Sequence, residues 1–123
     1  MNIRINDQSA INTIQEEFNS VFPYLKLEFF LKSIGSNGVY EKKILKLKSK
    51  KLGEYRNNDT SELIDITPIM KVVDLAKNFY DVYGLGVQVF RKSGKVWLET
   101  TFTDGWTLEE QNRQGEELSK DAG

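Results

Sequence analysis

The two halves of this sequence repeat one spacing of apolar residues, and this repetition restricts the fold more than any other feature. Shifting the chain by 61 residues aligns Phe18 with Phe79. Beyond Pro23 a shift of 60 residues aligns Phe30 with Phe90. The matches are sparse, but they fall at positions that a hydrophobic core needs. The sequence therefore predicts an internal duplication.

Each half is expected to begin with a strand and a helix. Period-two alternation at 3–5 and 64–66 is typical of half-buried strands. Asn6 and Thr67 are expected to cap the helices, and Pro23 and Gly84 to end them. Steps of three and four place one apolar stripe on each helix: Ile11, Ile14, Phe18 and Val21, then Val72, Leu75, Phe79 and Val82.

A hairpin and a short helical segment are expected to complete each half. The second hairpin has a tight turn at 92–95 and a return strand over 96–102. The first has a longer turn at 34–38 and a return strand over 43–47. A short helical segment is expected around Leu52, and another from Thr107, where Glu110 fits a capping box.

These elements predict an α+β fold in which duplicated βαββ(α) units share a mixed sheet, with helices packed on one face. Residues 1–123 are expected to form a single domain. Repeat one covers about 1–56, repeat two about 62–118, and 119–123 form a flexible tail. The polar stretch 56–62 is the expected joint.

Composition narrows the possible chemistry. The chain has no cysteine and no histidine, which excludes thiol nucleophiles and thiolate or imidazole metal ligands. No apolar run reaches the roughly 18 residues that a membrane-spanning helix needs, so no membrane association is expected. The first residues lack the basic cap and apolar segment of a secretion signal, which predicts a cytoplasmic protein.

Aromatic residues interrupt the sheet face that should point away from the helices. One interpretation is a second small core beneath the C-terminal segment. The other is an exposed patch that binds a protein partner or a second copy of the chain. The residues expected to make contact are the aromatic Phe30, Phe90 and Trp97, with Arg91, Lys92 and Lys95 as a rim.

A single-stranded nucleic-acid site is the alternative. The segment 42–51 is rich in lysine, and the hairpin tip at 91–95 adds further cations. The net charge of −1 argues against this role, and lysines on edge strands also serve to prevent sheets from pairing. The candidate contacts of the segment are Lys42, Lys43, Lys46 and Lys48.

Catalysis is the function that the sequence supports least. Carboxylates cluster at Glu99, Asp104, Glu109 and Glu110, but a turn and favourable charges at a helix start explain them more simply. The glycines of YGLGVQ lead into a strand, whereas a phosphate-binding loop leads into a helix. The sequence thus predicts a non-enzymatic binding or assembly module without cofactor or metal.

Overall fold

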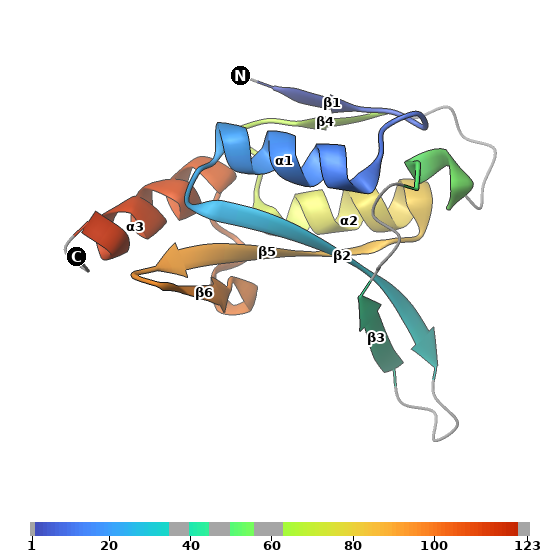
Figure 1. Cartoon of the computed structure of the whole chain (residues 1–123). Helices are drawn as coiled ribbons and strands as arrows, with labels where there is room; N and C mark the ends of the chain where they lie inside the picture. Colours follow the sequence, from blue (N-terminus) through green and yellow to red (C-terminus); the bar gives the residue numbers. More distant parts are fainter. Residues whose placement is uncertain (1, 35–39, 45–49, 56–62, 121–123) are drawn as a thin grey trace.

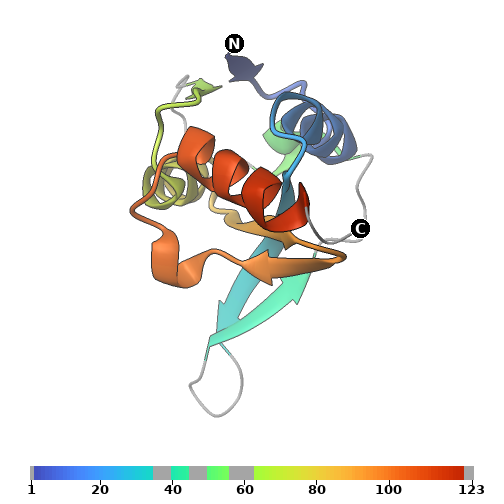
Figure 2. The ribbon, with the colours of Figure 1, turned by 90° about the vertical axis from the view of Figure 1, so that its left-hand side faces the viewer.

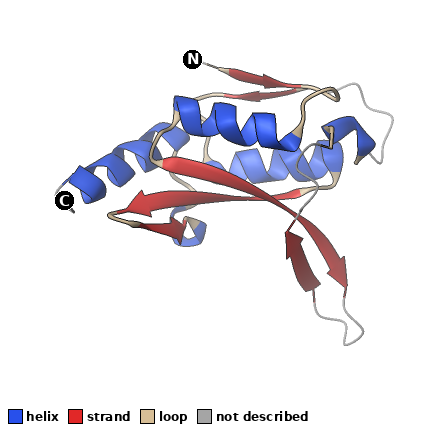
Figure 3. Cartoon of the chain, viewed as in Figure 1, coloured by secondary structure: helices blue, strands red, loops and turns tan. Residues whose placement is uncertain are grey.

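A computed structural model of the chain describes residues 2–34, 40–44, 50–55 and 63–120, which form three layers (Figures 1 and 3). The first layer is a two-stranded antiparallel sheet of β1 (Ile3–Ile5) and β4 (Ile64–Ile66). The middle layer contains α1 (Ile11–Val21) and α2 (Val72–Tyr83), which lie side by side (Figure 2).

The third layer is a four-stranded sheet in the order β3-β2-β5-β6, with every neighbouring pair antiparallel. Its strands are β2 (Leu25–Ile34), β3 (Tyr40–Ile44), β5 (Gly86–Ser93) and β6 (Val96–Glu99). The α+β class is confirmed, but the expected mixed sheet is wrong. Each helix carries the chain from one sheet to the other, so α1 and α2 make no parallel crossover within a sheet.

The apolar stripes of both helices are buried as predicted, except that Val21 is only partly buried. Phe18 and Phe79 are fully enclosed, and the core is a single cluster that also takes in β1, β4 and the helix-facing residues of β2 and β5. Both helices lie between the two sheets, and their apolar side chains are buried there (Figure 1).

The helices begin later than predicted, at Ile11 and Val72, so Asn6 and Thr67 are not their caps. Both residues instead make turns, since Asn6 O accepts from Ser9 N and Thr67 O from Met70 N. Gly84 does end α2, with a left-handed φ of 69° that glycine adopts without steric cost.

Backbone groups from distant segments satisfy the first amides of the helices. Ile11 N donates to Lys50 O at 3.2 Å, and Val72 N donates to Trp106 O at 3.1 Å. Isolated antiparallel bridges lie beside these bonds, at Ala10–Lys51 and Lys71–Thr107. The same local arrangement of backbone therefore recurs at equivalent places in the two halves.

Matched residues of the two halves also pair directly in the sheets. Arg4 lies opposite Asp65 at the centre of the β1–β4 ladder. Glu28 lies opposite Gln88 in the β2–β5 ladder. These pairs sit at the shifts of 61 and 60 residues that align the halves in sequence.

The short elements follow the predictions in part. A 3₁₀ turn, η1 (Leu52–Glu54), and a helix, α3 (Leu108–Lys120), occupy the two expected helical segments. The predicted capping box at α3 is confirmed, since Glu110 N donates to Thr107 Oγ1 at 3.1 Å and Thr107 N donates to Glu110 Oε1 at 3.2 Å. α3 is much longer than η1, and it packs on β5 across one end of the helical layer (Figure 2).

Several boundaries differ from the prediction. The return strand expected over 96–102 ends at Glu99, and the 3₁₀ turn η2 (Thr101–Thr103) follows it. Ser119 and Lys120, expected in the tail, belong to α3. Three predicted features fall wholly or largely outside the described residues: the turn at 34–38 after Ile34, the return strand 43–47 after Ile44, and the joint 56–62.

Candidate functional site

The face of the four-stranded sheet opposite the helices is the candidate interaction site. Among the described residues, no α-helix lies against this face (Figure 1). Side chains alternate across a sheet, so buried Leu27 and Val89 place their neighbours on the open side. The register lines up the residues of this open face in cross-strand pairs: Lys26 with Phe90 and Phe90 with Glu99, Glu28 with Gln88, and Lys92 with Trp97.

Phe90 and Trp97 form the aromatic centre of the open face. Both side chains are partly exposed. The ammonium of Lys26 lies 5.4 Å from the centre of the Phe90 ring and 5.1 Å from the centre of the Trp97 ring. Both distances are within the range of cation–π attraction. The three side chains therefore form one cluster, referred to below as the Lys26 cluster, across β2, β5 and β6.

Phe30 departs from the prediction because its ring is covered. Only 6% of the residue is exposed, so the expectation of an open aromatic at this position is wrong. Phe30 pairs with Gly86, and a Cβ built on Gly86 would lie 2.2 Å from a Phe30 ring carbon. The ring thus occupies the space above the glycine, whereas Phe90 lies opposite the long side chain of Lys26.

Arg91 does not belong to the rim of the open face. Its position in the alternation turns the side chain toward α3, where Nη1 donates to Gln111 Oε1 at 2.9 Å. Its guanidinium carbon lies 5.6 Å from the centre of the Trp106 ring. Nε is buried and has no hydrogen-bond partner among the described residues. Arg91 therefore ties β5 to α3 and is not available for contact on the open face.

Lys92 and Lys95 lie at the tip of the β5–β6 hairpin as predicted. Lys92 is directly opposite Trp97 and partly exposed, and Lys95 is exposed in the turn. Gly94 takes a φ of 64°, and its N–H donates to Ser119 Oγ at 3.2 Å. This bond holds the backbone of the hairpin tip against the end of α3.

The candidate nucleic-acid lysines are only partly within the described residues. The backbone register pairs Lys42 with Lys32, and Lys43 with Leu31. The side chains of Lys42 and Lys43 lie outside the description, as do Lys46 and Lys48 altogether.

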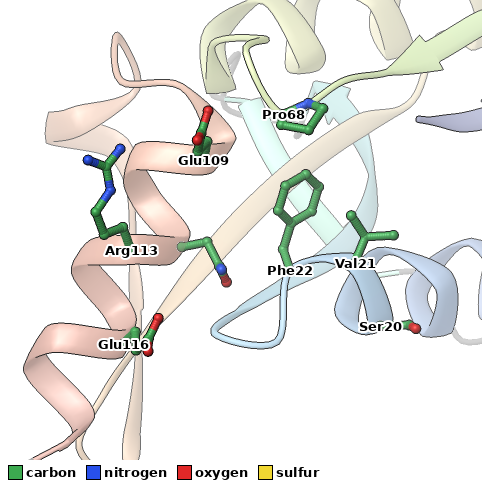
Figure 4. Close-up of a pocket in the computed structure, with 8 residues that line it drawn as sticks. Ser20, Val21, Phe22, Pro68, Glu109, Arg113 and Glu116 are labelled. Carbon is green, nitrogen blue, oxygen red and sulfur yellow. The ribbon is translucent and has the colours of Figure 1, made fainter. Parts of the chain in front are cut away.

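A cleft between the end of α1 and α3 was missed by sequence reasoning. It has a volume of about 670 Å³. Phe22 and Pro68 face each other across an apolar part, and α3 supplies a charged wall that includes Arg113 (Figure 4). No local motif could reveal it, because its walls come from residues far apart in the chain. Its lining residues are Ser20, Val21, Phe22, Pro68, Glu109, Asn112, Arg113 and Glu116.

Of the carboxylates considered for catalysis, Glu110 has a structural role in the capping box of α3. The backbone N–H and the hydroxyl of Thr107 lower the pKa of the Glu110 carboxyl below its ordinary value. A general acid at neutral pH needs the opposite shift. Within the described ranges, no three acidic side chains come together in a way that could hold a metal ion.

Comparison with protein-family models, with curated proteins and with solved structures finds no match for this chain. In the part of the chain that the structure describes, no helix has the length and apolar character to cross a membrane.

Proposed function

We propose that this chain is a non-enzymatic binding module that docks a protein partner on the open face of its four-stranded sheet. The observation that carries the proposal is the Lys26 cluster, with the partly exposed rings of Phe90 and Trp97 on a face that no described α-helix covers. Aromatic centres with charged surroundings contribute much of the energy at protein interfaces.

The chemistry of the face indicates what a partner should present. Apolar side chains would pack on the two rings, and a carboxylate would lie toward Lys92 or Lys95 at the hairpin tip. Glu99, opposite Phe90, brings negative charge to the same face, which favours a partner surface of mixed charge over a polyanion. A second copy of the chain is one such partner.

We also infer that the two halves arose from one duplicated βαββ(α) unit. The recurring backbone bonds at the helix starts and the pairing of Glu28 with Gln88 support this inference. The aromatic rings of the proposed site nevertheless come from the second half alone, because Phe30 is covered and its counterpart Phe90 is partly exposed. The cytoplasmic location stays a prediction.

The test uses Trp97→Ala and Phe90→Glu. Each variant should fold, and each should lose association, measured as mass by light scattering and as capture of partners from an extract of the source cells. Tyr80→Ala, which removes an exposed aromatic ring from α2 on the helical layer, is the matched control and should retain association. Equal capture by all variants would contradict the proposal. So would a loss of more than about 3 kcal/mol in the free energy of unfolding of Trp97→Ala or Phe90→Glu, which is the cost of emptying a core site.

Single-stranded nucleic acid is the second candidate, because aromatic rings beside a lysine on an open sheet can stack on bases. Anisotropy titration with single-stranded oligonucleotides at low salt separates the candidates. Reversing the charge of Lys42, Lys43, Lys46 and Lys48 should abolish nucleic-acid binding and leave protein association intact.

A further inference from the structure

The edge of β5 that faces β6 is paired along only part of its length. Val89 O accepts from Thr100 N at 3.3 Å and from Thr100 Oγ1 at 2.9 Å. The chain then leaves the sheet, because η2 begins at Thr101. No strand continues the β6 side of the ladder beyond this point within the described residues.

The backbone of Val87 points out of this edge. Lys92 N donates to Tyr24 O across the ladder with β2, and alternate residues of an antiparallel strand direct their backbone groups to the same side. The backbone groups of even-numbered residues of β5 therefore bond β2. The backbone N–H and C=O groups of Val87 and Val89 point to the opposite edge, although their side chains are buried. In the part of the chain that the structure describes, no hydrogen bond reaches the N–H or C=O of Val87.

A small cavity of about 120 Å³ lies beside this edge. α2 and β5 supply most of its apolar lining, and Thr100, Thr101 and Asp104 close it on the side of η2. Val73 lines the cavity and is 43% exposed, so its side chain contacts both the cavity and the solvent. The apolar lining residues are Val72, Val73, Ala76, Val87 and Val89.

The equivalent edge of the first half is protected. Gln15 Nε2 donates to Leu27 O at 2.9 Å and so satisfies the outward carbonyl that corresponds to Val87. The residue of α2 that matches Gln15 in the repeat is Ala76, which has no donor and lines the cavity instead. Proteins commonly protect strand edges in this way. Val87, of which 8% is exposed, receives no such side-chain hydrogen bond from the described residues, and this is a specific difference between the halves.

We propose that this edge of β5 binds an extended segment of a partner protein, which pairs with the N–H and C=O of Val87 and inserts a small β-branched side chain into the cavity. One donor and one acceptor spaced along a strand match an extended backbone. The cavity volume suits a valine-sized group, and its lining carries no charge apart from Asp104. The site borders the open face, because Gln88 of that face also lines the cavity, but it lies at the edge of the sheet and toward α2.

A random linear peptide library displayed on phage is the direct probe, selected against the whole chain. Selected peptides should alternate β-branched and polar residues, and binding should protect the Val87 amide from hydrogen exchange. Val73→Glu should weaken binding by roughly tenfold or more, since it places a charge at the cavity entrance. Val96→Glu is the matched control, because Val96 is similarly exposed, at 55%, in the β5–β6 hairpin.

Peptides that bind Val73→Glu as tightly as the unmodified chain would overturn the proposal, and so would a selection that enriches none. Self-association that Val73→Glu abolishes would also overturn it, because the edge would then serve a second copy. Trp97→Ala should leave selected peptides bound, so failure of this site and failure of the open-face site are distinguishable.

Discussion

The ammonium of Lys26, on β2, lies 5.1 Å from the centre of the Trp97 ring on β6, with β5 between the two strands. The lysine side chain thus extends across β5, where its ammonium also lies near the Phe90 ring. A contact that joins three strands fixes the positions of both rings on the open face before any partner arrives. Such preorganisation reduces the ordering cost of binding.

Replacing Lys26 with methionine should weaken the Lys26 cluster without emptying it. The apolar stem remains, but the cation–π attraction is lost, which should lower the free energy of unfolding by about 0.5–1 kcal/mol. Urea denaturation followed by tryptophan fluorescence measures the change. Lys95→Met, in the exposed hairpin turn, should leave stability within error, and an equal loss in both variants would argue against the cluster.

Gly86→Ala should be destabilising because the new Cβ would lie 2.2 Å from a carbon of the Phe30 ring. Overpacking of this kind typically costs about 1–3 kcal/mol. The double variant Gly86→Ala with Phe30→Ala should lose clearly less stability than the sum of the two single changes, because the clash disappears with the ring. Additive losses in the denaturation curves would mean that the two residues do not share this space.

Gly84→Ala should cost about 1–2 kcal/mol, because an alanine must then hold the left-handed φ of 69° that ends α2. Gly105→Ala is the control, since a Cβ built there meets no atom within 4 Å. Thermal unfolding of the two variants should therefore differ clearly. Equal melting temperatures would show that α2 ends differently in solution.

Glu110 should make stability depend on pH. Its pKa is lowered from the ordinary 4.5 by hydrogen bonds from Thr107, so the unfolded state binds the proton more tightly. The resulting stabilisation is present above pH 4.5 and is lost as the pH falls through the folded-state pKa. Stability of the chain and of Glu110→Gln, measured from pH 7 to pH 3, should therefore differ most near neutrality. A difference in stability between the two proteins that grows toward acid pH would contradict the prediction.

Local patterns predicted the parts of the fold that depend on neighbouring residues. The apolar stripe through Phe18 and the capping box at Thr107 need only a helical period and a cap, and both were predicted correctly. The starts of the helices were not, because their first amides bond Lys50 and Trp106, which are distant in sequence.

The candidate site was predicted only where strand alternation was sufficient. Phe90 and Trp97 lie on the open face as expected, and Lys92 lies beside them. Alternation alone could not show that the Phe30 ring covers Gly86, which depends on cross-strand register. Arg91 was assigned to the rim because of its charge, although its odd position in β5 directs it toward α3.

Residue-resolved hydroxyl-radical footprinting of Phe90 and Trp97 tests the central claim most directly. Both rings should be oxidised in the isolated protein, to an extent far above that of enclosed Phe18 and Phe79, and both should be protected once a captured partner is bound. Rings that resist oxidation in the isolated protein, or that oxidise equally in the complex, would contradict the account.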